Sequence, residues 1–203
     1  MEPILMLKGI LIGFALAVPI GPIGILCIHK TITKSRWHGV VIGLGGATAD
    51  LLYSFLAASG ISAISATLEN HRFWIRLIGG AVLIGLGIFT YFTHLREKKV
   101  DLKTNKLWRT YLFTIILTLT NPLTIFAFIA IFASMGIGHG ILLASISSLA
   151  IGVFIGSCSW FLLLNFGANY YGSKLNRNKL QLVNKIAGIL IILAGMMAIA
   201  KAV

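Results

Sequence analysis

The stretch FALAVPIGPIGILCIHK, residues 14–30, places two prolines and two glycines inside an apolar run long enough to cross a membrane. Proline lacks a backbone N–H and costs about 3 kcal/mol in a helix interior, so Pro19 and Pro22 leave the carbonyl groups of Ala15 and Val18 without their helical partners. In lipid such groups are tolerated only where they face protein or a water-filled cavity. Two prolines flanked by glycines therefore predict an unwound segment in this span, where one proline would indicate only a kink.

The composition favours a membrane protein. Of the 203 residues, 58% are hydrophobic and 11% are charged, and the mean hydropathy is +0.95. Soluble domains carry about 25% charged residues. This chain has too little polar surface to coat a globule in water, so the bilayer is its expected solvent. The first apolar run continues to Ile28, which exceeds the length of a signal peptide, and we expect it to be retained.

Six apolar windows have a length in or near the range of about 17–25 residues that a membrane helix needs. A charged linker, residues 95–109, separates three of these windows from the other three. An odd number of spans per half forces the halves into opposite orientations, so we expect an all-helical membrane fold with a 3+3 inverted repeat, residues 1–94 and 110–203. The six expected spans cover residues 8–28, 39–62, 73–94, 110–134, 141–167 and 180–202.

Basic residues concentrate on one side of these spans. The loops 29–38, 95–109 and 168–179 hold twelve Lys and Arg residues, against four on the opposite side. The positive-inside rule places these loops in the cytoplasm and both termini outside the cytoplasmic membrane. The net charge of +12 is thereby explained by topology, and we expect no nucleic-acid partner.

The fourth span contains a second helix-breaking motif, Asn121-Pro122, at a position that corresponds to Gly21-Pro22 in the first span. Paired interruptions at matching positions of two halves indicate a binding site near the middle of the membrane. We expect Pro19 and these two motifs to border that site. The freed carbonyl groups and the amide of Asn121 are then expected to contact the substrate.

Asp50 lies midway along the second span, in GLGGATADLLYSF, while the other four acids fall in the N-terminal tail or in loops. A charged Asp at the centre of a membrane helix costs about 2.5–3.5 kcal/mol on insertion scales. Two roles remain open at this point. Asp50 is either a protonated structural hydrogen-bonder, or a group that exchanges a proton for the ammonium group of a substrate.

The remaining residues give no sign of enzymatic or metal chemistry. Cys27 and Cys158 lie in apolar segments without a CxxC motif or a His/Cys cluster, so packing is their expected role. The phosphate-binding motif GxxxxGK[ST] is absent from the sequence, which argues against ATP hydrolysis. We therefore expect neither a cofactor nor a bound metal.

Four segments together carry a family resemblance: LAVPIGPIGILCIHKTITKSRWHGVVIGLGGATAD, WIRLIGGAVLIGLG, TLTNPLTIFAFIAIF and VNKIAGILIILAG. In their order and spacing they resemble the LysE/RhtB family of amino-acid exporters over nearly the full chain. The resemblance implies that Asp50 matches the family's acid in span two and Asn121-Pro122 its Asn-Pro in span four. It also implies that Ile20-Gly21-Pro22 matches the family's P-G-P or I-G-P motif.

The expected function is secondary active export of a small amino acid or related metabolite, driven by protons. One alternative is a cation or metal exporter on the same scaffold, and another is a membrane protein that serves assembly or regulation without transport. The substrate cannot be read from the sequence, and whether the chain forms homo-oligomers is left open.

Overall fold

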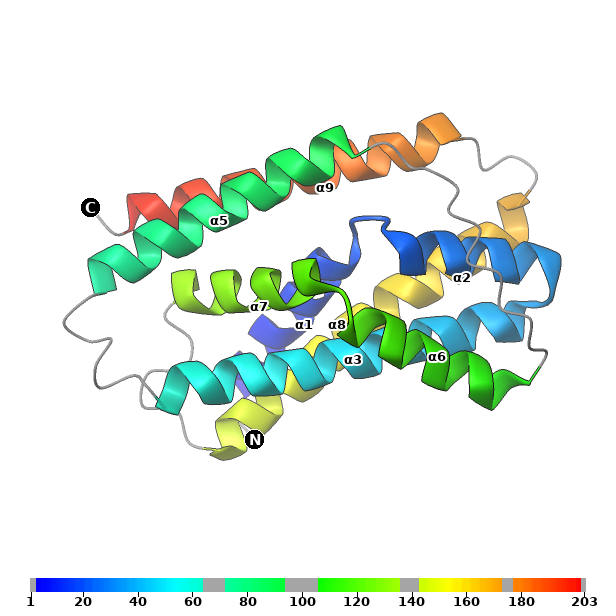
Figure 1. Ribbon diagram of the computed structural model, residues 1–203, viewed down its shortest axis with the longest axis horizontal. Coiled ribbons are helices and arrows are strands. Elements are labelled where there is room, and N and C mark those ends of the chain that lie inside the picture. Colours follow the sequence, from blue (N-terminus) through cyan, green and yellow to red (C-terminus); the bar gives the residue numbers. More distant parts are fainter. Residues whose placement is uncertain (1–2, 64–71, 94–105, 136–142, 173–176, 202–203) are drawn as a thin grey trace.

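A computed structural model describes residues 3–63, 72–93, 106–135, 143–172 and 177–201 of the chain. Within these ranges the regular structure is entirely helical, and the helices lie roughly along the long axis of the molecule (Figure 1). They are α1 (Pro3–Ala17), α2 (Pro22–Thr33), α3 (Arg36–Ala63), α5 (Arg72–Phe92), α6 (Leu107–Leu119), α7 (Pro122–Met135), α8 (Leu143–Tyr171) and α9 (Arg177–Ala200).

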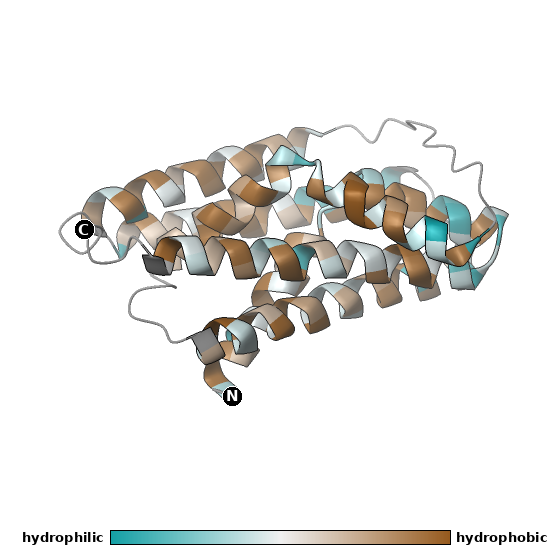
Figure 2. Cartoon of the chain, turned by 60° about the horizontal axis from the view of Figure 1, so that its bottom comes forward, coloured by the Kyte–Doolittle hydropathy of each residue, from teal (hydrophilic) through white to brown (hydrophobic). Residues whose placement is uncertain are grey.

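Four of these helices, α3, α5, α8 and α9, are each long and apolar enough to cross a membrane. The others form two bent pairs that meet the same criteria together: α1 with α2 at 77°, and α6 with α7 at 62°. The described residues therefore contain four clear spans, or up to six if each bent pair counts as one. Hydrophobic residues occur along most of the length of these helices (Figure 2), and many large hydrophobic side chains are exposed, as lipid-facing helices require.

The interruptions predicted from the prolines are present, and several helices extend beyond the apolar windows expected as spans. The first helix begins at Pro3 rather than residue 8, and α8 continues to Tyr171 rather than ending at 167. Helical hydrogen bonding does not stop at the edge of the apolar window, because polar residues also continue a helix. Helix α6 begins at Leu107, so the end of the predicted linker 95–109 is helical, while residues 94–105 lie outside the described residues.

Lys30 was expected in the loop between the first two spans. It lies instead in the last turn of α2 and is only 3% exposed. Neighbouring helices cover it, since α2 packs on both α3 and α8. A count of loop charges from sequence cannot detect this packing.

Small residues allow two pairs of helices to approach closely. Helix α1 packs on α8, where a Cβ atom added at Gly13 would overlap the backbone of Val153 and one at Gly156 would overlap the carbonyl group of Ile10. Helix α5 packs on α9 in the same way, as described below. Close backbone approach through small residues is a common means of helix association in lipid.

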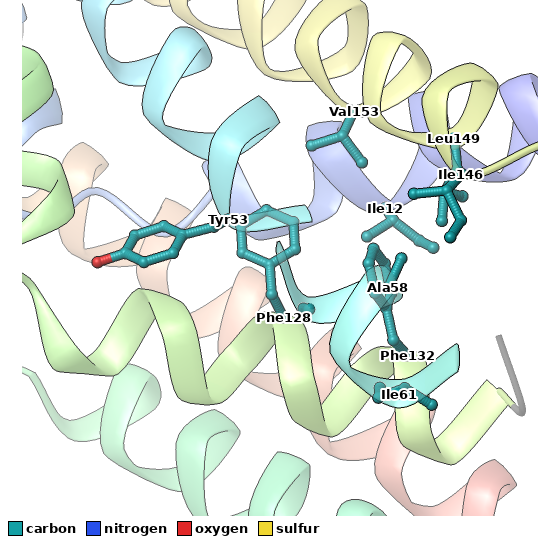
Figure 3. Close-up of a cluster of buried hydrophobic side chains, with 10 residues drawn as sticks. Ile12, Tyr53, Ala58, Ile61, Phe128, Phe132, Ile146, Leu149 and Val153 are labelled. Atoms are coloured by element: carbon teal, nitrogen blue, oxygen red, sulfur yellow. The ribbon is translucent and has the colours of Figure 1, made fainter. Parts of the chain in front are cut away.

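Two hydrophobic clusters lie on either side of the middle of α3 and α8. The larger one joins α1, α3, α7 and α8 and includes Ile12, Phe128 and Val153 (Figure 3). The smaller one joins α2, α3, α6 and α8 around Leu26 and Ile42. Both helix breaks and Asp50 lie along the chain between the residues of these two clusters.

Candidate functional site

The break in the first span is held by a side chain from the last helix. Ile20, between α1 and α2, is 2% exposed, and Asn184 of α9 is also 2% exposed. The N–H of Ile20 donates to Oδ1 of Asn184 at 2.6 Å, and Nδ2 of Asn184 donates to the carbonyl oxygen of Ile20 at 3.2 Å. One amide therefore satisfies both backbone groups of a residue that no helix pairs, as burial away from water requires.

The helices on each side of this break end close to it. The N–H of Val18 still donates to Phe14 at 3.1 Å, and the carbonyl of Gly21 accepts from Ile25 at 3.0 Å. Gly21 is the N-cap of α2, and a Cβ atom added to it would meet nothing within 4 Å. Open space therefore adjoins the backbone at this point.

The carbonyl groups that the prolines were expected to free, those of Ala15 and Val18, accept no backbone hydrogen bond within the described residues. Carbonyl groups without a backbone partner are suited to accept hydrogen bonds from a ligand, and an ammonium group carries three donors.

The break in the fourth span is organised differently. Tyr53 of α3 donates its hydroxyl hydrogen to the carbonyl of Leu119 at 2.6 Å, at the end of α6. Asn121 caps α7: its Oδ1 accepts from the N–H of Leu123 at 3.2 Å, and its Nδ2 donates to Thr124 at 3.0 Å. The amide expected to contact substrate is thus engaged by its own helix. Pro122, like Pro22, occupies the first position of the helix that follows, where proline is well tolerated.

Asp50 lies in the middle of α3 and is 7% exposed. The side-chain hydrogen-bond partner of Asp50 is Ser157 of α8, and the hydroxyl of Ser157 donates to the carbonyl of Gly13 in α1 at 3.1 Å. Tyr53, one turn further along α3, points its hydroxyl away from the cluster of Figure 3 and toward the end of α6. Helix α3 therefore connects the α1–α8 contact with the second break.

A serine hydroxyl carries a single hydrogen. That hydrogen can be donated to the carbonyl oxygen of Gly13 or to the carboxyl group of Asp50. When Ser157 donates to Gly13, a protonated, neutral Asp50 can donate its own hydrogen to Ser157, and a neutral carboxyl group costs less to bury than an unpaired carboxylate. A carboxylate would compete with the Gly13 carbonyl for the Ser157 hydrogen.

The sequence analysis missed Asn184 and Ser157. Asn184 is a polar residue inside the expected sixth span, and this was the available signal, because polar side chains at membrane depth are often functional. Ser157 resembles other serines of its helix and carries no comparable signal. Among the residues with described positions, no three His, Cys, Asp or Glu side chains form a group that could hold a metal ion.

Comparisons with known proteins place these features in a family. The chain is 28% identical to "Putative amino acid efflux protein YcgF" of Bacillus subtilis (strain 168) over 197 residues, which cover 93% of this chain and 92% of that protein. It is 29% identical to "Uncharacterized membrane protein YahN" of Escherichia coli (strain K12) over 112 residues, or 52% of this chain and 49% of that protein. No solved structure matches the chain. Residues 14–201 match the LysE type translocators, and the chain, a multi-pass membrane protein, belongs to this family.

Proposed function

We propose that the protein is a secondary active exporter of a small amino acid or related metabolite, and that protons drive it. The family consists of translocators, and the name of its Bacillus subtilis relative refers to amino acid efflux. The observation that carries the proton coupling is Asp50, a buried acid in the middle of α3 that is linked through Ser157 to the broken first span.

In this proposal Asp50 exchanges a proton for the cationic group of the substrate. When Asp50 is protonated, it donates to Ser157, which in turn holds the carbonyl of Gly13. An ammonium group that reaches the site favours the carboxylate form, since opposite charges at close range stabilise each other in a medium of low dielectric constant. The proton then leaves, and Ser157 is free to turn its hydrogen toward the carboxylate.

The residues of the two breaks are proposed to border this site. Pro19, Gly21 and Pro22 bring carbonyl groups without a backbone partner and open space to it, while Asn121 and Pro122 form the second border. Because Asn121 already caps α7, we assign it the role of fixing the start of that helix, and direct contact with substrate requires it to exchange partners. A structure in which both breaks face lipid would overturn this assignment.

The proposed architecture is an inverted repeat of residues 1–94 and 110–203. In such a repeat α1, α2, α3 and α5 correspond to α6, α7, α8 and α9. The contact of α1 with α8 then has its counterpart in α6 with α3, and that of α2 with α8 in α7 with α3. The repeat also relates the two hydrophobic clusters, because the helices of the larger cluster (α1, α3, α7 and α8) have as counterparts those of the smaller one (α6, α8, α2 and α3). These correspondences support the repeat.

The function is tested by reconstituting the purified protein in liposomes and measuring flux of a panel of amino acids and divalent cations under an imposed pH gradient. We expect uptake of at least one amino acid into vesicles that are acidic inside, and its loss when a protonophore removes the gradient. Flux of divalent cations alone would favour the metal exporter. Flux of no solute would favour a protein that serves assembly or regulation.

The proposed topology has its own test. With both termini outside, a membrane-impermeant thiol reagent added to intact cells should label single cysteines at His71 and His139 but not at Lys34 or Lys103. All four variants should react once the cells are permeabilised, which serves as the control. External labelling at Lys103 would contradict the positive-inside assignment.

A further inference from the structure

Helices α5 and α9 form a closely packed unit, which we call the α5–α9 pair (Arg72–Phe92 and Arg177–Ala200). A Cβ atom added at Gly80 would lie 2.8 Å from the carbonyl oxygen of Gly195, and one added at Gly195 would lie 2.7 Å from that of Gly80. The same reciprocal approach recurs two turns along, where a Cβ atom added at either Gly87 or Gly188 would lie 2.7 Å from the carbonyl oxygen of the other glycine. Two such contacts fix both the spacing and the register of the pair.

Helix α7 is the main connection between this pair and the rest of the molecule. A Cβ atom added at Gly79 of α5 would lie 3.0 Å from the carbonyl oxygen of Ala130 and 3.5 Å from the Cβ atom of Ser134, both in α7. No other helix packs along the pair to a similar extent in the described part of the chain. Figure 1 shows the pair along one side of the molecule, with α7 between it and α3.

The inverted repeat predicts one helix contact that the described residues do not show, and it involves this pair. The counterpart of the α5–α7 contact is a contact of α9 with α2, and within the described residues these two helices do not pack along each other. The pair therefore packs along α7 and not along α2. Under the proposed topology, the α7 side faces outward and the α2 side faces the cytoplasm. In an inverted-repeat transporter, movement of the α5–α9 pair from α7 to α2 would produce the opposite arrangement, in which the pair packs along α2.

A buried amide connects α9 to the segment that precedes α2. The two hydrogen bonds between Asn184 and Ile20 tie α9 to the unwound segment of the first span. Both residues are 2% exposed, so water does not replace these bonds at small displacements. A movement of α9 toward α2 therefore has to carry Ile20 with it or break both bonds.

We propose that the α5–α9 pair moves as one unit between α7 and α2 during transport, and that Asn184 is the positioning residue that couples this movement to the unwound segment. The proposal rests on the proposed function, because only a transporter needs both states. It names the helices that close the site on each side: α5 with α7 outside, and α9 with α2 inside.

A disulfide between α5 and α7 tests the movement. In a background with Cys27→Ser and Cys158→Ser, we introduce Gly79→Cys and Ser134→Cys, whose Cβ positions are 3.5 Å apart and so within disulfide range. Oxidation should slow substrate flux at least about tenfold, and reduction should restore it, because opening of the outer side becomes impossible. The matched controls are Gly79→Cys alone and Ser134→Cys alone, which cannot form the bond and should leave flux unchanged on oxidation. Equal flux in the oxidised and reduced Gly79–Ser134 protein would overturn the movement.

The distance between two spin labels tests the movement without a measurement of transport. Spin labels at His29 of α2 and Asn178 of α9, both exposed, should report two distances in liposomes, and the α5–α7 disulfide should leave only the longer one. A single distance that the disulfide does not alter would overturn the movement even if flux is observed. Absence of flux from the reduced protein together with two distances would instead contradict the proposed function.

The role of Asn184 is tested by Asn184→Leu, which removes both hydrogen bonds at similar volume, and by Asn184→Asp, which retains the acceptor for the Ile20 N–H. We expect both variants to alter the ratio of the two spin-label distances and to slow flux, with the Leu variant affected more. Lys179→Leu, in the same helix but exposed, is the control. If the Asn184→Asp protein accumulates normally and both its distance ratio and its flux are unchanged, Asn184 does not couple α9 to the unwound segment.

Discussion

Asp50→Asn is expected to abolish proton-coupled export while the protein still inserts at normal abundance. The substitution preserves the size of the side chain and its ability to hydrogen-bond to Ser157, but the amide can neither release a proton nor attract an ammonium group. Export driven by a pH gradient and exchange of substrate at equilibrium should therefore both be lost. Both are measured as radiolabelled substrate flux in liposomes, normalised to the amount of reconstituted protein.

Asp101→Asn is the matched control, because it makes the same chemical change in the predicted linker and should leave flux and its pH dependence unaltered. If the Asp50→Asn protein exports at the wild-type rate with the same dependence on the pH gradient, Asp50 is a structural hydrogen-bonder. In that case the coupling group lies elsewhere. Retained exchange with lost response to the gradient would show that Asp50 carries the proton but does not bind the substrate.

The features of this site that could be predicted from sequence are those with local causes. A proline interrupts the helix in which it stands, whatever surrounds it, so both breaks could be located to within a few residues. Asp50 was identifiable because an acid in an apolar span is rare. The capping role of Asn121 also has a local origin, since an Asn before a helix commonly bonds the backbone N–H two residues on.

The contacts that give the site its geometry could not be predicted, because their partners are distant in sequence. Ile20 and Asn184 are separated by 164 residues, and Ser157 and Gly13 by 144. No pattern of hydropathy or spacing pairs such residues before the helices are arranged in space. The buried position of Lys30 has the same origin: a lysine near the end of a span is usually an interfacial charge, and packing of α2 on α3 and α8 decides otherwise.

Gly87→Leu is expected to separate the α5–α9 pair and to lower the stability of the whole protein. A Cβ atom at this position would lie 2.7 Å from the carbonyl oxygen of Gly188 and 2.9 Å from the backbone nitrogen of Ile192. Overpacking costs about 1–3 kcal/mol where side chains can rearrange. Here the obstacle is backbone, so relief requires the helices to move apart, and we expect a cost at the upper end of this range.

Gly85→Leu provides a matched control in the same helix. Gly85 is exposed, and a Cβ atom there would meet nothing within 4 Å, so the leucine faces lipid and improves helix propensity. The comparison uses the thermal unfolding of both purified variants in detergent and their accumulation in the membrane. Only Gly87→Leu should unfold at a lower temperature than the wild type and accumulate less.

Equal loss in both variants would mean that any bulky side chain in α5 is harmful, and that the close contact with α9 does not hold the pair together. Because the pair is proposed to move as one unit, its internal contact must be stronger than its contact with α7, and Gly87 is the position where this requirement is most directly tested.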